Sequence, residues 1–429
     1  MRMGISRREL LLTGAGVGLG SLLLPALGSA QSGNTSPVSL LLGSHMDYLI
    51  ALTSKYQALH GVEPKVELVT TPDLPVKLSS AFIARRSLGD AVFVDAATLA
   101  GLADKGWLTD VGDMVEAKFL PAGLLPNSLT AARYNGGIYG VPVTIGAPIM
   151  HWNKDLCEKA GLDPEAPSDW HSTPKSWSEF VRYAKTITSA EGDIYGAVDN
   201  WGGTGSVFTF GSLLQMHGGR FLDDERKPIM NSEAGVEALS RMVELLHVEK
   251  AIDPASVTYN WVFDASPSYL AGKRGFFLTW PFIADIANNG QDSAIKGRSG
   301  FAPNPSVITS ASVDGSEFLV VPTFAENPEG GRQFIELALD LPNQIRQGSE
   351  TAWAPVLDAA LSDPAVEGHL PVAAVIRQSY LYPVDGGFSA DRQAWMEILC
   401  GELSQAFAQS KTPRAALDDA VRLIEQSRA

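Results

Sequence analysis

The sequence predicts an α/β protein in which the strands of a parallel sheet alternate with helices. From residue 37 to residue 103, short apolar runs typical of buried strands alternate with segments of helical periodicity. This order favours a parallel sheet with helices on its faces. The chain has 429 residues, of which 45% are hydrophobic and 19% are charged, so it is long enough for two or three globular domains.

The alternating segment contains three expected strands and two expected helices. The strands run from Val38 to Leu42, from Val66 to Val69 and from Ala91 to Val94. The helices run from Tyr48 to Leu59 and from Val76 to Ala84. Each strand is short and mostly apolar, which is the pattern of a strand that is covered on both faces.

An apolar segment from Val141 to Met150 predicts a further strand. Pro142 and Pro148 interrupt this segment, and since proline cannot donate to a sheet ladder, the strand is expected to end or change direction. A short helix should follow, with Asn153 as its N-cap and Gly161 as its stop signal.

The next helix begins with a predicted capping box. Ser176 and Glu179 have the spacing at which each side chain accepts a hydrogen bond from the backbone N–H of the other residue. The apolar residues of this helix recur at helical spacing and are Trp177, Phe180, Val181 and Ala184.

The second half of the chain has similar signals. Asp223 and Asp224 are interpreted as a solvated hairpin tip instead of a catalytic carboxylate pair, because adjacent turn residues diverge. The other expected elements are helices at 213–216, 236–246 and 328–341, strands at 275–279 and 318–321, and a final helix beginning at Thr412-Pro413.

Residues 1–30 have the features of an export signal. Arg7 and Arg8 precede an uncharged apolar run that ends in small residues at 28–30. The paired arginines favour the Tat route, with general secretion as the alternative. A membrane anchor is the competing interpretation, but the run is rich in glycine and contains Pro25. The mature protein is therefore expected to be periplasmic and soluble.

The charge of the mature chain restricts its partners. Removal of residues 1–30 leaves 30 basic and 47 acidic residues, a net charge of about −17. This charge repels nucleic-acid phosphates and anionic membranes, so neither is an expected partner. We expect the mature chain to be a monomer.

The sequence lacks the common motifs of enzymes and metal sites. Cys157 and Cys400 are the only cysteines, and they could form one disulfide or none. The seven histidines are scattered, so no zinc site is expected. No nucleophile elbow, P-loop or dinucleotide fingerprint occurs, and we expect no cofactor and no catalysis. A glycosidase stays open as an alternative, because its carboxylates leave no local signature.

Several segments that follow one another along the mature chain carry a family resemblance. They are His151 to Leu156, Lys159 to Leu162, Pro174 to Phe180, Asp104 to Asp110, Gly136 to Pro142, Gly218 to Asp223, Leu270 to Lys273 and Thr412 to Leu417. Together they resemble the family 1 extracellular solute-binding proteins, which are the sugar-binding receptors of bacterial ABC importers. Trp152 departs from the family pattern, in which tyrosine is common at this position, and Gly89-Asp90 departs from the usual Pro-Asp pair.

The resemblance implies a two-lobed periplasmic binding protein fold with three interlobe crossings and a ligand cleft. On this layout the N-terminal lobe contains residues 31–146 plus 280–318, and the C-terminal lobe contains residues 147–279 plus 319–429. The crossings are then expected near Gly146, Trp280 and Leu319. A ligand that contacts both lobes would stabilise the closed form, which the membrane permease of an ABC importer would recognise.

Candidate ligand-binding residues follow from the chemistry of sugars and from this layout. Sugars present apolar C–H faces edged by hydroxyl groups, so their sites combine aromatic platforms with carboxylate and amide partners. The candidates are Ser44, His45, Asp47, Asp95, Trp152, Asp199, Asn200, Trp201, Trp280, Phe282, Trp353 and Trp395. The alternatives are a core position for each tryptophan, a helix cap for Asp95 and hinge packing for Trp152. If Trp201 binds sugar, Trp201→Ala should weaken binding far more than stability.

The expected function is therefore that of a receptor that captures a mono- or oligosaccharide and delivers it to the permease of an ABC importer. A receptor for a polyol or a sugar phosphate is the first alternative, and an exported enzyme that acts on polysaccharide is the second. A phosphate site would need converging basic residues, and the candidate loops contain few arginines and lysines.

Overall fold

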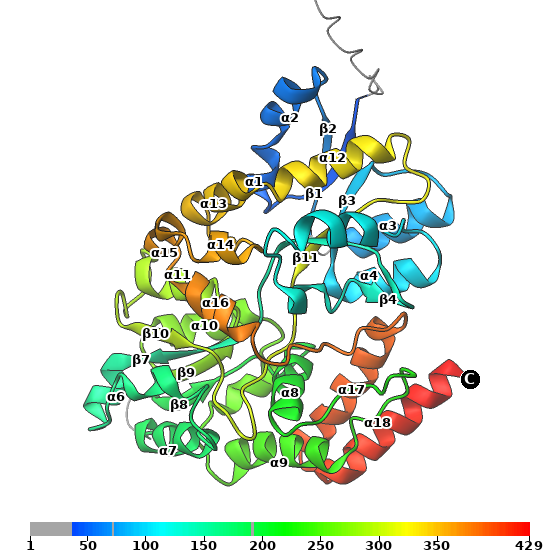
Figure 1. Cartoon of the computed structure of the whole chain (residues 1–429). Coiled ribbons are helices and arrows are strands. Elements are labelled where there is room, and N and C mark those ends of the chain that lie inside the picture. Colours follow the sequence, from blue (N-terminus) through cyan, green and yellow to red (C-terminus); the bar gives the residue numbers. More distant parts are fainter. Residues whose placement is uncertain (1–36, 71–72, 190–192) are drawn as a thin grey trace, which may run out of the picture. The chain divides into compact units, whose positions relative to one another are not determined.

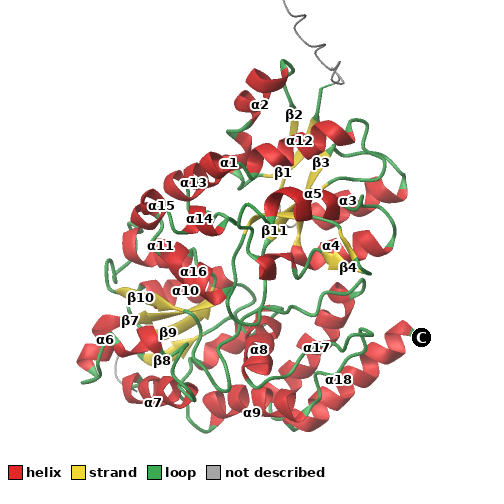
Figure 2. Ribbon diagram, in the orientation of Figure 1, coloured by secondary structure: helices red, strands yellow, loops and turns green. Residues whose placement is uncertain are grey.

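The computed structural model describes residues 37–70, 73–189 and 193–429. The expected export signal at residues 1–30 lies outside these ranges. Figures 1 and 2 show two separate groups of strands, each flanked by helices. The alternation of strands and helices in the sequence therefore correctly predicts an α/β architecture.

The first sheet has five strands in the order β2-β1-β3-β11-β6. Strand β1 pairs in parallel with both β2 and β3, as the sequence predicts, whereas β11 is antiparallel to both β3 and β6. The strands are β1 (Ser39–Gly43), β2 (Lys65–Val69), β3 (Ala91–Asp95), β6 (Val141–Thr144) and β11 (Glu317–Val320).

Helices from two distant parts of the chain pack around the first sheet. They are α1 (Asp47–Ile50), α2 (Thr53–His60), α3 (Leu74–Ile83), α4 (Ala96–Asp104), α5 (Gly112–Met114), α12 (Pro328–Ala338), α13 (Leu341–Glu350), α14 (Asp358–Leu361), α15 (Pro364–His369) and α16 (Val372–Ser379). A hairpin of β4 (Arg133–Tyr134) and β5 (Gly137–Ile138), a π-helix at Val115–Phe119 and a 3-10 helix at Pro126–Leu129 complete this part. The helix predicted from Tyr48 to Leu59 is divided into α1 and α2.

The second sheet has four strands in the order β10-β7-β9-β8. Strand β9 is parallel to β8 and antiparallel to β7, and β10 is antiparallel to β7. The strands are β7 (Ile149–Asn153), β8 (Tyr195–Val198), β9 (Arg274–Thr279) and β10 (Ser299–Ala302). The apolar segment from Val141 to Met150 thus contributes to both sheets, because the chain leaves β6 and enters β7 within it.

The helices around the second sheet again come from two parts of the chain. They are α6 (Lys154–Lys159), α7 (Trp177–Ile187), α8 (Gly205–Met216), α9 (Glu233–His247), α10 (Val262–Leu270), α11 (Ile283–Asn289), α17 (Arg392–Phe407) and α18 (Pro413–Arg428), with 3-10 helices at Ala166–Asp169 and Pro254–Thr258. Among the described residues, no helix combines the length and the apolar character needed to cross a membrane.

Two of the predicted helix caps have different outcomes. The Asn153 side chain accepts hydrogen bonds from the backbone N–H groups of Asp155 and Leu156, at 3.0 and 3.3 Å, which confirms the cap of α6. The capping box at Ser176 is wrong. Its hydroxyl instead donates to the carbonyl oxygen of Trp170 and accepts from the backbone N–H of Ser306 at 2.8 Å, so it ties the start of α7 to a distant loop.

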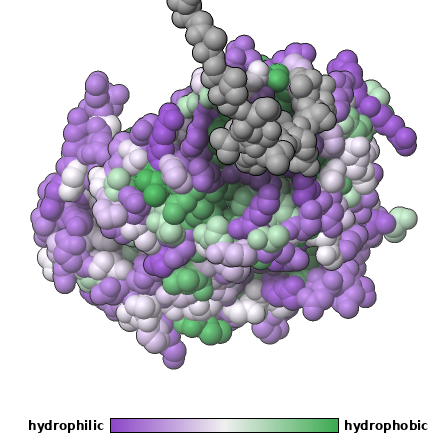
Figure 3. Space-filling model, turned by 45° about the horizontal axis from the view of Figure 1, so that its top comes forward, coloured by the Kyte–Doolittle hydropathy of each residue, from purple (hydrophilic) through white to green (hydrophobic). Residues whose placement is uncertain are grey.

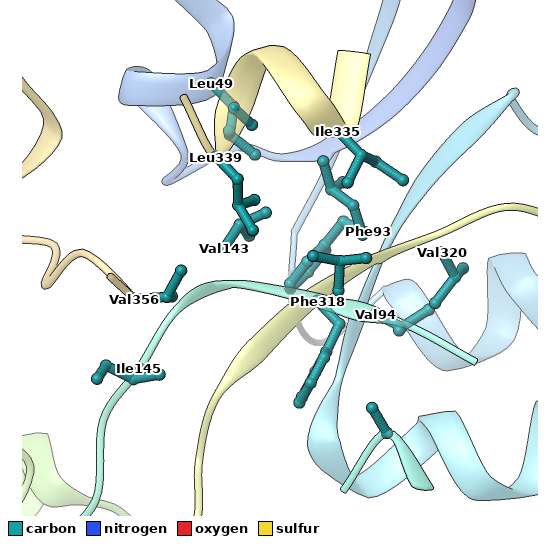
Figure 4. Close-up of a cluster of buried hydrophobic side chains, with 14 of the residues drawn as sticks. Leu49, Phe93, Val94, Val143, Ile145, Phe318, Val320, Ile335, Leu339 and Val356 are labelled. Carbon is teal, nitrogen blue, oxygen red and sulfur yellow. The ribbon is translucent and has the colours of Figure 1, made fainter. Parts of the chain in front are cut away.

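Each sheet has its own hydrophobic core. Figure 4 shows part of the first core, in which Phe93 and Phe318 from the sheet lie beside Ile335 and Leu339 from the region of α12. We call the elements around this core the first lobe, and the elements around the second sheet the second lobe. On the face shown in Figure 3, side chains are mainly hydrophilic and the hydrophobic ones gather in limited patches.

Strand pairing and packing correct the predicted lobe boundaries. Residues 299–302 were expected in the N-terminal lobe, but they form β10 and pair with β7 in the second sheet. Residues from 319 to 384 were expected in the C-terminal lobe, but β11 and the residues up to Val384 pack in the first core. Only the pairing partner shows which sheet a strand joins, and that partner lies far away in the sequence.

The positions at which the chain passes between the lobes differ from the predicted positions for the same reason. Gly146 lies between β6 and β7, at the expected crossing. Trp280 is followed by α11, whose Ile283 and Ala287 pack with residues of the second lobe, so the chain does not cross there. The chain leaves the second sheet after β10 and reaches the first sheet at β11, in which Leu319 lies.

Hydrogen bonds join two of the segments that connect the lobes, those at Gly146 and before β11. The backbone N–H of Gly315 donates to the carbonyl oxygen of Gly146 at 2.8 Å. The hydroxyl of Tyr380 accepts from the backbone N–H of Gly146 at 3.2 Å and donates to the carboxylate of Asp314 at 2.6 Å. Because Asp314 is buried, its pKa is raised to about 6. These two of the connecting segments therefore lie side by side and share one polar network.

Candidate ligand-binding site

One group of candidate residues lies at the ends of three strands of the first sheet, where β1 and β3 end and β11 begins. His45 follows the end of β1, Asp95 ends β3, and Glu317 at the start of β11 is the strand partner of Asp95. The Nε2 atom of His45 lies 2.9 Å from a carboxylate oxygen of Glu317, and the ring centroid of His45 lies 5.0 Å from that of Trp353. We call His45, Asp95, Glu317 and Trp353 the first-lobe edge. Strand ends of this kind are where open α/β sheets bind ligands.

The second lobe contains a small pocket, with about 20 Å³ available to the centres of water-sized spheres, which is partly open to solvent. Its wall combines two aromatic rings, Phe208 and Trp280, with several polar side chains. We call this the second-lobe pocket, and its lining residues are Pro148, Asp199, Asn200, Gly205, Phe208, Thr209, Ser212, Leu278, Thr279, Trp280 and Asn304. They come from the ends of β8 and β9, the start of α8, and the connections beside β7 and β10.

Two amide side chains of the pocket have unused hydrogen-bonding capacity. Asn304 donates to the carbonyl oxygens of Pro148 and Ala311, both at 3.0 Å, and its own side-chain oxygen is buried with no partner among the described residues. The side-chain amide of Asn200 likewise forms no hydrogen bond with the part of the chain that the structure describes. A buried polar atom without a partner is costly, so a ligand hydroxyl group would be stabilising here.

Asp199 is the carboxylate of the pocket. It accepts hydrogen bonds from the hydroxyl of Thr209 at 2.8 Å and from the backbone N–H of Asn200 at 2.7 Å. Burial nevertheless raises its pKa from 3.8 to about 7, because the charged form loses its hydration. The carboxyl group is therefore fixed in position and able to exchange hydrogen bonds with hydroxyl groups in either protonation state.

The raised pKa of Asp199 predicts a pH-dependent stability. A carboxyl group that binds its proton more tightly in the folded state adds stability below its ordinary pKa, and this contribution is lost as the pH rises through the folded value of about 7. The free energy of unfolding should therefore fall between pH 5 and pH 8, and Asp199→Asn should fall less. Urea unfolding at both pH values measures the two slopes. The raised pKa of Asp314 also makes the free energy of unfolding fall as the pH rises, so Asp314→Asn is the matched comparison for Asp199→Asn. Equal slopes for Asp199→Asn and wild type would contradict the assignment.

Arg392 lies between the two groups of residues. Its Nε atom donates to the carbonyl oxygen of Gly386 at 2.8 Å, and its guanidinium carbon lies 6.0 Å from the ring centroid of Phe208. Burial lowers its pKa to about 10, whereas the charges of Asp95, Asp314 and Asp385 raise it. It forms no ion pair with any described residue, so the terminal nitrogens of a charged guanidinium group are free to donate.

The structure brings together half of the candidates chosen from the sequence. His45, Asp95 and Trp353 belong to the first-lobe edge, while Asp199, Asn200 and Trp280 line the second-lobe pocket. Asp95 also caps α4, because its carboxylate accepts from the backbone N–H of Thr98 at 2.8 Å, so the alternative interpretation of Asp95 is confirmed.

Three candidate tryptophans are corrected to core residues. Trp152 is buried in β7 and donates its indole N–H to the carbonyl oxygen of Pro164 at 2.7 Å. Trp201 is buried against Phe407, with the rings stacked at 5.2 Å. Trp395 is buried and donates to the hydroxyl of Ser389 at 3.0 Å. Their burial in the second core excludes them as platforms for a ligand.

The remaining candidates lie on the margins of the site. Ser44 and Asp47 are exposed beside His45, in the segment that leads from β1 to α1. Phe282 is half-buried two residues after Trp280, and its ring centroid lies 5.7 Å from that of Phe263. These three residues do not line the second-lobe pocket.

Sequence reasoning did not identify several residues of the site. Glu317, Phe208, Asn304 and Arg392 have no local motif that distinguishes them from ordinary strand, helix or loop residues. Glu317 could have been found from its position at the start of the strand predicted at 318–321, since strand ends hold ligands in this fold class. Phe208, Asn304 and Arg392 can be recognised as site residues only from contacts between segments that are distant in the sequence.

The structure contains no candidate for a resident metal or a structural disulfide among its described residues. No group of three or more potential metal-ligating side chains occurs there. Cys157 and Cys400 are both free, and burial raises the pKa of the Cys157 thiol to about 12. A thiol that stays protonated in this way is inert as a nucleophile.

Comparison with solved structures identifies the fold. Maltose-bound MalE3 of T. maritima superimposes with a TM-score of 0.76 and 23% sequence identity, covering 91% of this chain and 99% of that chain. MalE of Xanthomonas citri gives a TM-score of 0.78 and 17% identity, covering 91% and 97%. The fold is that of the two-lobed periplasmic binding proteins.

Sequence comparison identifies the family. Residues 42–345 match the family of bacterial extracellular solute-binding proteins, to which this chain belongs. A probable amino-acid ABC transporter periplasmic-binding protein of Sinorhizobium fredii, y4oP, is 26% identical over 300 residues, which cover 68% of this chain and 65% of that protein. An arabinooligosaccharide-binding protein of Bacillus subtilis is 26% identical over 184 residues, which cover 42% and 38%. This chain therefore spans less than two thirds of the length of either relative.

Proposed function

We propose that this protein is a periplasmic receptor that binds a carbohydrate and delivers it to the permease of an ABC importer. The observation that carries the proposal is the second-lobe pocket, in which two aromatic rings lie beside the carboxyl group of Asp199 and the unpartnered amide oxygen of Asn304. Aromatic surface combined with fixed polar groups is the composition of a sugar site. The receptor acts as a monomer and carries out no chemistry on its ligand.

The first-lobe edge supplies the second half of the site. Asp95 belongs to this edge and acts on the charge of Arg392, which in turn lies over Phe208 of the pocket. A ligand that contacts residues of both lobes stabilises the arrangement in which they are close together by its differential affinity for it. The permease would therefore recognise the ligand-bound receptor by the changed relative position of its lobes.

A receptor for a polyol or a sugar phosphate is the second candidate, and Arg392 is the observation that favours it. A free guanidinium group would pair with a phosphate. Curated relatives include a mannitol-binding protein of Pseudomonas aeruginosa and the sn-glycerol-3-phosphate-binding protein UgpB of Salmonella typhimurium. However, the negative charges of Asp95, Asp314 and Asp385 act on Arg392, raise its pKa and offset its positive charge. A neutral sugar is therefore the better fit, since hydroxyl groups accept from the guanidinium without adding a negative charge.

Export is part of the proposal. Residues 1–30 would direct the chain to the periplasm through the Tat route and would then be removed. N-terminal sequencing of the protein from a periplasmic extract tests this step, and a mature N-terminus near residue 31 is expected. Retention of the folded precursor in the cytoplasm of a strain without Tat translocase would support the Tat route over general secretion.

The direct test of function is calorimetric titration of residues 31–429 with sugars, polyols, sugar phosphates and amino acids. We expect saturable binding of a carbohydrate, a higher melting temperature in its presence and no change in the sugar after prolonged incubation. Binding of an amino acid alone, or consumption of the sugar by a substoichiometric amount of protein, would contradict the proposal. Binding of a phosphorylated ligand, lost in Arg392→Met, would favour the second candidate.

A further inference from the structure

A second and larger pocket lies on the second lobe, between helices α7 and α9. About 530 Å³ of it is available to the centres of water-sized spheres, a size typical of sites for small molecules. We call it the α7–α9 pocket, and its lining residues are Lys175, Trp177, Ser178, Val181, Arg241, Glu244, Leu245, Glu249, Val307 and Ile308. None of them lines the second-lobe pocket. In Figure 1, α7 and α9 lie on the side of the second lobe that faces away from the first lobe.

The apolar part of this pocket is fixed in position. Trp177 and Val181 from α7 and Leu245 from α9 line it, and Trp177 and Leu245 are buried in the second core. The loop that carries Val307 is tied to the start of α7, because the backbone N–H of Trp177 donates to the carbonyl oxygen of Ser306 at 3.0 Å. A preorganised apolar surface loses little conformational entropy when it binds a ligand.

One lining cation has no carboxylate partner. Glu244 pairs with Arg241 at 3.1 Å, and Glu249 pairs with Lys185 at 2.5 Å. Lys175 is exposed and forms no ion pair with any described residue. Every other charged residue of the lining is thus already paired, and Lys175 is the charge left for a ligand.

The start of α7 also holds a hydrogen-bond donor without a partner. Trp177 is 7% exposed, and its indole N–H forms no hydrogen bond with the part of the chain that the structure describes. A buried donor without a partner is costly, so an acceptor atom of a ligand would be stabilising there. The ammonium group of Lys175 and the indole N–H of Trp177 both lack an acceptor, which favours a ligand that carries acceptor oxygens.

We infer that the α7–α9 pocket binds a small apolar molecule with one carboxylate group, and that Lys175 is the partner of that carboxylate. The apolar body of the ligand lies against Trp177, Val181 and Leu245. An aromatic acid or a medium-chain aliphatic acid has this composition. One free cation beside two glutamates suits a singly charged group, whereas a phosphate needs several converging basic residues. The pocket is separate from the second-lobe pocket, so this inference does not depend on the proposed function.

The test is calorimetric titration of residues 31–429 with naphthoate and octanoate. Naphthylmethanol and octanol are the neutral analogues with the same apolar bodies. Lys175→Gln removes the charge of the proposed partner. Lys250→Gln is the matched control, because Lys250 is also exposed, has a similar left-handed backbone, with φ of 50° against 60° for Lys175, and forms no ion pair with a described residue, but does not line the pocket.

A second pair of variants tests the apolar part of the pocket. Ile308→Ala shortens a lining side chain that is 74% exposed. Val248→Ala is its control, because Val248 is 70% exposed and lies outside the lining. Neither side chain belongs to a core, so both variants should fold, and their melting temperatures verify this.

We expect the acids to bind with a dissociation constant of about 1 mM or lower, and more tightly than their neutral analogues. Lys175→Gln should weaken binding of the acids by about two- to fivefold, the effect of one exposed ion pair, and leave the neutral analogues unchanged. Ile308→Ala should weaken acids and neutral analogues alike, by about twofold or more. Lys250→Gln and Val248→Ala should bind as wild type.

Three outcomes would overturn the inference. The first is that neither acid binds. The second is equal affinity for acids and neutral analogues with no effect of Lys175→Gln, since the carboxylate then has no partner in the pocket. The third is loss of acid binding in Trp280→Ala with full binding in Lys175→Gln, which would place the acids in the second-lobe pocket. The titration with sugars decides the proposed function separately in each case.

Discussion

Replacing Trp280 with alanine is expected to weaken carbohydrate binding by about 30-fold or more while the protein stays folded. Trp280 is half-buried, lines the second-lobe pocket and is the only tryptophan among the described residues that does so. Truncation of an aromatic side chain at the centre of a binding site commonly costs about 2 kcal/mol or more, which corresponds to this loss of affinity. Calorimetric titration of wild type and Trp280→Ala with the same sugar measures the effect.

The contacts of Trp280 explain why it should dominate binding. Its ring packs over Gly315, where a side chain would collide with it at 2.3 Å, and edge-on against Phe208 at 5.4 Å. Gly315 in turn is hydrogen-bonded to Gly146 in the connection between the lobes. A ligand on this ring would therefore contact the pocket wall next to the connecting segments, where it can influence the relative position of the lobes.

Trp107 provides the matched control for this prediction. It is also half-buried and packs edge-on against one phenylalanine, Phe82, at 5.5 Å, but it belongs to the first core and not to the pocket. Trp107→Ala should lower the melting temperature and leave the dissociation constant unchanged. If Trp280→Ala binds sugar as well as Trp107→Ala does, the second-lobe pocket is not the binding site.

The positions of most strands and helices were predictable from local sequence signals, whereas the capping box at Ser176 was not confirmed. The three strands and helix α3 between residues 37 and 103 follow from apolar runs and helical periodicity, and β1, β2 and β3 are parallel as this order requires. The helix predicted from Tyr48 to Leu59 is divided into α1 and α2, and α4 was not predicted. The strand around 318–321 was also located correctly. Its membership of the first sheet was not, because β11 pairs with β3, which lies more than 200 residues earlier in the chain.

The site was less predictable, because burial and not residue type separates a binding tryptophan from a core tryptophan. Trp201 and Trp280 both follow a strand of the second sheet, and both are preceded or followed by residues of the pocket wall. The sequence between β8 and α8 does not show that Phe407, from α17, covers the ring of Trp201. Likewise, the sequence around Arg392 does not reveal that this residue forms no ion pair with a described carboxylate.

Trp201→Ala is accordingly expected to lower the free energy of unfolding by about 3–5 kcal/mol, the range for removing a large aromatic side chain from a core. Trp201 is 2% exposed and stacks on Phe407 with an interplanar angle of 18°. The loss has two parts, the apolar area that is no longer buried and the cavity that the surrounding residues cannot close. This expectation reverses the one drawn from the sequence, in which Trp201 was a platform for the ligand.

Urea unfolding of wild type, Trp201→Ala and Trp201→Phe measures this effect. Trp201→Phe should lose less stability than Trp201→Ala, because a smaller ring can still stack on Phe407. Trp261→Ala is the control from the same lobe, and since that ring is 43% exposed, it should change the free energy of unfolding by less than about 1 kcal/mol. A Trp201→Ala protein with the stability of wild type and no affinity for sugar would instead restore the ring to the binding site, and it would require Phe407 to leave the stack when ligand binds.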